Sequence, residues 1–150
     1  PGVLQCRMSK NERILRIGGR FDIACRVSGS HPGKAVVFIH GFGSAKEHFR
    51  HAFGSPFLEG FLLVAIDLVG FGRSRGPETF GYGMDEQARV MLSTLDELGI
   101  ESFHLVAHSM GGLVALRYLE EYDTPVRGAI ILAPWLGTAV DVPRWKATVP

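Results

Sequence analysis

Ser102-Phe103-His104-Leu105-Val106-Ala107-His108-Ser109-Met110-Gly111-Gly112 is the stretch from which we interpret the rest of this 150-residue chain. The apolar run predicts a strand over 103–107, and the following residues predict a helix over 110–122. Only a sharp turn fits between them, and the small residues around Ser109 permit strained dihedral angles. The helix directs its free N–H groups toward whatever binds beside the hydroxyl. Such a turn presents a nucleophile next to a stabiliser of negative charge.

Length and composition indicate one soluble globular domain, with 46% hydrophobic and 21% charged residues. A formal net charge of +1 gives no field that would attract nucleic acid or a membrane surface. We find no signal-peptide pattern and no apolar run of membrane-spanning length, so we expect a cytoplasmic protein without a membrane span. Cys6 and Cys25 lack metal-type spacing, and we expect no metal or cofactor. A disulfide, the oligomeric state and the natural start of the protein before Pro1 stay open.

Strand and helix patterns alternate along the chain, which predicts an α/β fold with a mostly parallel sheet and helices on both faces. A two-glycine turn between two extended runs predicts an antiparallel hairpin at one edge of this sheet. In the second helix we expect Leu113, Leu116 and Leu119 to pack on the sheet. Ser44 and Glu47 form a capping-box pattern that predicts the start of a short helix. The expected strands are 14–17, 21–27, 35–39, 61–66, 103–107 and 128–133, and the expected long helices are 85–98 and 110–122.

Three informative loops begin where predicted strands end, at 40–43, 67–74 and 108–112. In an open parallel sheet the carboxyl ends of the strands meet at one edge, and chemistry gathers there. The first loop is His40-Gly41-Phe42-Gly43, and the second runs from Asp67 to Ser74 with glycines at 70 and 72. We therefore expect all three loops to contribute to one site.

Together these loops resemble those of the α/β-hydrolase family, over roughly residues 14–133. The turn at Ser109 resembles the family's nucleophile elbow, G-x-S-x-G, with Ala107 in place of the first glycine. The loop at 40–43 resembles its oxyanion loop, and 67–74 resembles its D-x-x-G-x-G-x-S turn. The resemblance implies that Ser109 is the nucleophile and that the backbone N–H groups of Phe42 and Met110 form the oxyanion hole. It also implies supporting roles for a set of loop residues: His40, Gly41, Gly43, His108, Gly111 and Gly112.

The family's other catalytic groups are harder to place. Asp67 precedes the serine, whereas the family's acid follows it, so we expect Asp67 to accept backbone N–H groups within its turn. None of the six histidines follows Ser109, although the family's base comes late in the chain. Asp141 is a candidate for the acid. We interpret 1–133 as the N-terminal part of a hydrolase core that is C-terminally incomplete, and 134–150 as the start of a lid or cap.

Two functions remain open at this point. The first is a serine hydrolase, such as an esterase or lipase, acting on a small-molecule ester or related acyl substrate. A serine at position 109 argues against the family's epoxide hydrolases and dehalogenases, which attack with a carboxylate. The second is a binding protein that keeps the fold without catalysis, which the missing histidine favours. By itself the chain is expected to be inactive or very weak as a catalyst, because an unassisted hydroxyl is a poor nucleophile.

Overall fold

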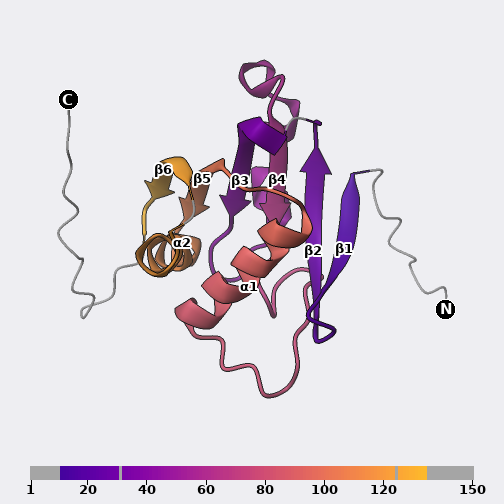
Figure 1. Cartoon of the computed structure of the whole chain (residues 1–150), viewed down its shortest axis with the longest axis vertical. Helices are drawn as coiled ribbons and strands as arrows, with labels where there is room; N and C mark the ends of the chain where they lie inside the picture. Colours follow the sequence, from indigo (N-terminus) through magenta and orange to yellow (C-terminus); the bar gives the residue numbers. More distant parts are fainter. Residues whose placement is uncertain (1–10, 31, 124, 135–150) are drawn as a thin grey trace.

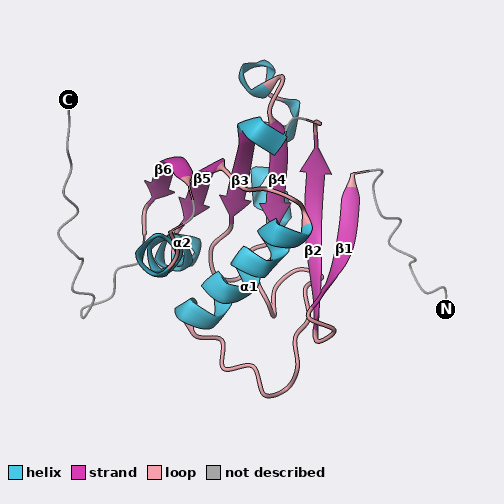
Figure 2. Ribbon diagram, in the orientation of Figure 1, coloured by secondary structure: helices cyan, strands magenta, loops and turns pink. Residues whose placement is uncertain are grey.

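A single six-stranded sheet organises the chain in the computed structural model, which describes residues 11–30, 32–123 and 125–134 (Figure 1). The strands lie in the order β1-β2-β4-β3-β5-β6. Their bounds are β1 Glu12–Ile17, β2 Phe21–Ser28, β3 Ala35–Ile39, β4 Leu62–Ile66, β5 Phe103–His108 and β6 Val126–Leu132. The two α-helices are α1 Met84–Glu97 and α2 Met110–Glu121. Four short 3-10 helices complete the set: η1 Pro32–Lys34, η2 Lys46–Phe49, η3 Ala52–Gly54 and η4 Pro56–Leu58 (Figure 2).

The pairing of the strands confirms the predicted sheet. β1 and β2 form the antiparallel hairpin, and β2 joins β4 in the antiparallel sense. From β4 onward the sheet is parallel through β3, β5 and β6. β3 therefore lies between β4 and β5, with its carboxyl end next to the ends of both neighbours.

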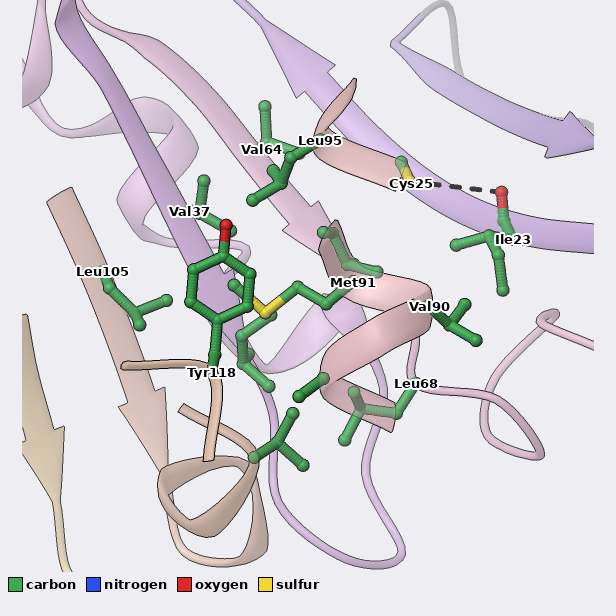
Figure 3. Packing of buried hydrophobic residues seen from close by; sticks show 14 of the residues in the cluster. Ile23, Cys25, Val37, Val64, Leu68, Val90, Met91, Leu95, Leu105 and Tyr118 are labelled. Carbon is green, nitrogen blue, oxygen red and sulfur yellow. Dashed lines mark hydrogen bonds between the residues drawn. The ribbon is translucent and has the colours of Figure 1, made fainter. Parts of the chain in front are cut away.

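Both faces of the central strands are buried, and different elements cover them. On one face, α1 and α2 contact each other and pack on alternate strand residues such as Val37, Val64 and Leu105. Figure 3 shows Tyr118 of α2 and Met91 of α1 pointing into this core. The other face, with Phe38 among its residues, is covered by Phe49 of η2, Phe53 of η3 and Leu58 of η4, and among the described residues no long helix packs on it. Burial of each large apolar side chain contributes about 1.5–3 kcal/mol.

The buried face of α2 differs in part from the predicted one. Val114, Ala115 and Tyr118 are fully buried, whereas Leu113, Leu116 and Leu119 are only half-buried. Of these leucines, Leu119 packs against the core as expected. The rotation of α2 is fixed at its first turn, where Gly111 lies against the backbone of β3. The helix therefore turns a stripe of smaller residues and one tyrosine toward the sheet. Hydrophobic spacing alone could not reveal this, since leucines and the buried residues both recur at helical intervals.

The capping box expected at Ser44 is wrong. η2 begins at Lys46 after Ala45, and no side chain caps it. The backbone N–H of Lys46, which a Ser44 cap could have bound, donates instead to Oδ1 of Asp67 at 2.6 Å. Ser44 itself donates its N–H to the carbonyl of Gly41 at 3.3 Å, within the preceding loop. The remaining element boundaries agree with the predicted ones to within two residues. Asp141, Cys6 and the expected lid beyond Pro134 lie outside the described residues.

Candidate active site

Ser109 occupies a strained turn between β5 and α2, as the sequence predicts. Its backbone adopts φ 53° and ψ −122°, a conformation that costs a non-glycine residue about 1–3 kcal/mol. Two backbone hydrogen bonds hold it there: Ser109 donates its N–H to Leu132 at 2.9 Å, and Gly112 donates to the Ser109 carbonyl at 2.9 Å. α2 begins at Met110, immediately after the serine. A half-buried hydroxyl thus stands at the N-terminus of a helix.

Two glycines at the start of α2 allow the helix to approach the sheet closely. A β-carbon on Gly111 would collide with the carbonyl oxygen of His40 and lie 2.6 Å from that of Ile39. A β-carbon on Gly112 would lie 2.8 Å from Cγ2 of Ile131. Because the atoms facing Gly111 are backbone atoms of β3 and the loop after it, that contact tolerates no side chain. Both glycines therefore lie in close contact with the sheet.

The loop at 40–43 lies directly against the serine turn. A β-carbon on Gly41 would be 3.0 Å from Cβ of Ser109 and 3.3 Å from the carbonyl oxygen of His108. Phe42 follows, with 78% of its side chain exposed and its ring edge against Phe71 at a centroid distance of 5.6 Å. The loops at 40–43 and 108–112 therefore meet at Ser109, and the loop at 67–74 contributes Phe71, whose ring contacts that of Phe42.

His40 joins the first loop to the second through backbone hydrogen bonds. Its Nδ1 donates to the carbonyl oxygen of Gly41 at 2.8 Å, and its Nε2 accepts the N–H of Leu68 at 3.0 Å. Both bonds require the neutral ring with the proton on Nδ1. Burial lowers the pKa of His40 below its ordinary value, which favours that neutral form. With both nitrogens engaged, His40 supports the loops and has no free nitrogen to act as a base toward Ser109.

Asp67 organises the second loop, as expected. It is fully buried, and its Oδ2 accepts the N–H of Arg73 at 3.0 Å across the turn. Ser74, which ends the motif, donates its hydroxyl to the carbonyl of Asp67 at 2.7 Å and accepts the N–H of Ala24 in β2 at 2.9 Å. Gln87 of α1 binds both the N–H and the carbonyl of Val69, each at 3.0 Å. The turn at 67–74 is therefore held by hydrogen bonds within itself and by hydrogen bonds to β2 and α1.

Sequence reasoning missed Gln87 and Lys46. Lys46 has only 2% of its side chain exposed, and its Nζ contacts Asp67 at 3.1 Å. A lysine in a polar stretch gives no sign of burial, because two of the three carboxylates that contact it, those of Asp67 and Glu12, come from distant parts of the chain. For Gln87 there was a weak indication of burial, because it precedes Ala88, which the apolar spacing places on the buried face of the helix.

His108 precedes the serine and stacks on another histidine. Its ring lies 4.9 Å from that of His48 in η2, with the planes 16° apart. Its Nδ1 is buried and makes no hydrogen bond to any described residue. His48 is exposed, and its ring covers one side of His108.

Other features bear on what the site holds. Within residues 11–30, 32–123 and 125–134 no three metal-binding side chains come together, and no helix there is long and apolar enough to cross a membrane. A pocket of about 600 Å³ lies between the β1–β2 hairpin and α1, lined by residues such as Phe21, Phe80 and Arg89. None of its lining residues belongs to the loops at 40–43, 67–74 or 108–112, so it is separate from Ser109.

Comparison with known proteins places these features in a family. A family model described as the alpha/beta hydrolase fold matches residues 34–150. The chain is similar to a probable lysophospholipase, BODYGUARD 4, of Arabidopsis thaliana (36% identity, 69% of this chain and 25% of that protein). It is also similar to Lipase 3 of Moraxella sp. strain TA144 (33% identity, 79% of this chain and 35% of that protein). A solved membrane phospholipase A, described as a bacterial virulence factor, superposes with a TM-score of 0.73 at 30% identity, covering 80% of this chain and 38% of that one.

The chain thus spans well under half the length of these relatives. The family model nevertheless covers most of the chain, and strands β3 to β6 and the Ser109 turn lie within the matched residues. The chain belongs to the α/β-hydrolase fold family.

Proposed function

We propose that the full-length protein is a serine hydrolase that cleaves an ester or related acyl bond through an acyl-enzyme on Ser109. The observation that carries this proposal is the contact between Gly41 and Ser109, in which a β-carbon on Gly41 would lie 3.0 Å from the serine Cβ. It brings the loop that resembles an oxyanion loop against a serine with strained backbone at a helix N-terminus. A merely structural strand-to-helix turn would require neither the strain nor the facing loop.

The chemistry follows from these parts. The Ser109 hydroxyl oxygen attacks the substrate carbonyl carbon, and the carbonyl oxygen becomes an oxyanion. In this proposal the N–H groups of Phe42 and Met110, which directly follow Gly41 and Ser109 in the chain, bind that oxyanion. Each such donor contributes about 3–4 kcal/mol to the transition state. A general base takes the serine proton and gives it to the leaving alcohol, and water, deprotonated by the same base, then hydrolyses the acyl-enzyme to release the acid.

The general base and its acid come, in this proposal, from residues beyond Pro134. None of the histidines at 31, 40, 48, 51, 104 and 108 follows Ser109. Both nitrogens of His40 bind backbone, and the ring of His108 stacks on His48. Asp141 remains a candidate for the acid, since it follows β6 in the chain. The names of the lipase and lysophospholipase relatives favour a lipid ester as the substrate.

A serine-directed probe tests the proposal. The full-length gene product and residues 1–150 alone are each treated with a fluorophosphonate, and each is assayed with a short-chain aryl ester. We expect the full-length protein to label at Ser109 and to turn over the ester, and Ser109→Ala to lose both. Residues 1–150 alone should be slower by orders of magnitude, because loss of a triad histidine costs about 10⁶ in kcat. An inert full-length protein would favour the non-catalytic binding member, and equal activity of the two would show that the base lies within residues 1–150.

A further inference from the structure

Lys46 is a buried cation at the far end of the loop that faces Ser109. Its Nζ lies 2.8 Å from Glu47, 3.1 Å from Asp67 and 3.5 Å from Glu12. Asp67 is fully buried, and only 16% of the Glu12 side chain is exposed. An unpaired lysine at this position would cost several kcal/mol, so these carboxylates are what permit its burial. The same groups raise the pKa of Lys46: burial alone would lower it, but the hydrogen bonds to Glu47 and Asp67 outweigh burial.

Asp67 binds Lys46 through both of its carboxylate oxygens. Oδ1 accepts the backbone N–H of Lys46 at 2.6 Å, and Oδ2 accepts Nζ at 3.1 Å. One carboxylate therefore fixes both the main chain and the side chain of Lys46, and it also binds the N–H of Arg73 in its own turn. Glu12 of β1 contacts both Lys46 and Arg73, at 3.5 and 3.8 Å. Three segments of the chain meet at this cluster.

The consequence concerns the segment between His40 and Lys46. At its first residue the His40 ring is bonded to Leu68. At its last residue Lys46 is bonded to Asp67, one residue before Leu68. Between these anchors lie Gly41, packed against Ser109, and the exposed Phe42. The span is short and contains two glycines, so its path depends on where both ends are held.

We infer that Lys46 is a positioning residue for the reaction at Ser109. Its two hydrogen bonds to Asp67, which we call the Lys46 clamp, set the position of the Phe42 N–H group. This inference rests on the proposed function. Lys46 touches neither the substrate nor the serine in this role; it acts through the loop. If the clamp is lost, the Phe42 N–H shifts relative to the oxyanion, and a shift of about 1 Å can cost on the order of 10² in rate. Substrate binding, which does not need that donor in the ground state, changes little.

Three variants of the full-length protein test the inference. Lys46→Met removes the charge with little change in side-chain volume. Lys46→Arg keeps the charge but places a longer side chain at a buried position. Lys34→Met is the matched control, because Lys34 is an exposed lysine. Rates for a short-chain aryl ester are expressed per serine titratable with fluorophosphonate, so that unfolded protein does not lower the apparent kcat. Thermal unfolding is recorded for each variant.

For Lys46→Met we expect kcat to fall about 10- to 100-fold, with KM within about threefold of the wild type. Lys46→Arg should fall less but measurably, and Lys34→Met should match the wild type. A normal kcat per titrated serine in Lys46→Met, whatever its unfolding temperature, would overturn the inference. If Lys46→Met does not fold, Lys46→Arg decides in the same way: a reduced kcat at unchanged KM supports the inference, and a wild-type kcat refutes it. Failure of the proposed function itself would appear separately, as a wild-type protein without turnover.

Discussion

Gly111→Ala offers the sharpest test of how the elbow is built. On intrinsic propensity alone, alanine in a helix is about 1 kcal/mol better than glycine, so the exchange would stabilise α2. The structure predicts the opposite. The new β-carbon would collide with the carbonyl oxygen of His40 and lie 2.6 Å from that of Ile39. Both are backbone atoms at the end of β3, which is paired with strands on both sides and cannot give way easily.

The magnitude can be worked from that collision. Inserting one carbon into a packed site costs about 1–3 kcal/mol, and more where rigid backbone must move. Because the facing atoms here are backbone, we take a cost of about 2–3 kcal/mol, and after the gain of about 1 kcal/mol in propensity we expect a net loss of about 1–2 kcal/mol in the free energy of unfolding. For a folding unit of about 150–250 residues that loss corresponds to a fall of roughly 2–8 °C in Tm, and for a larger one to a smaller fall.

Thermal unfolding of the full-length protein is the assay, with Gly54→Ala as the matched control. Gly54 has a negative φ and open space around it, so alanine there should leave Tm unchanged or slightly raised. A Gly111→Ala protein as stable as this control, or more stable, would refute the reasoning. It would show that α2 can move away from β3 freely, and that the contact does not hold the serine turn in place.

Two further predictions concern the same region and its core. In Gly41→Ala the β-carbon would lie 3.0 Å from Cβ of Ser109, so the loop must move away by a few tenths of an ångström. We expect kcat to fall about tenfold, with Tm changed by less than about 3 °C. A wild-type kcat would contradict this prediction. Burial raises the pKa of the Cys25 thiol to about 12, so mass-spectrometric mapping should find it unmodified by iodoacetamide at pH 8 until the protein is unfolded. Because the unfolded thiol ionises near pH 9 and the folded one does not, the free energy of unfolding should fall by up to about 1.4 kcal/mol per pH unit above pH 9, and Cys25→Ala should remove that slope.

The sequence was sufficient for features that depend on local pattern. Apolar runs predicted the central strands, and the small residues around Ser109 predicted strained dihedral angles at the turn, where the structure has a φ of 53°. These succeeded because each rests on neighbours in the chain, whose chemistry can be read directly.

Features that depend on distant partners could not be predicted. The Ser44 cap failed because Asp67, which is 21 residues beyond Lys46, binds the Lys46 N–H instead. The rotation of α2 was missed because β3 backbone, and not the leucine spacing, decides which side faces the sheet. The stacking of His48 on His108 likewise joins residues that are far apart in the sequence. Tertiary contacts override local preference in each case.

The two halves of the proposed oxyanion hole are held by different means. On the side of Met110, the support is backbone: Ser109 bonds to Leu132, Gly112 bonds to Ser109, and Gly111 rests on β3. On the side of Phe42, the support is side chains, with His40 and Lys46 anchoring the loop to Leu68 and Asp67. Substitutions of polar side chains should therefore displace the Phe42 half alone, and only exchanges at glycine should displace the Met110 half. If both donors serve one oxyanion, combining Lys46→Met with Gly111→Ala should lower kcat by less than the product of the single effects, because either displacement already separates the donors.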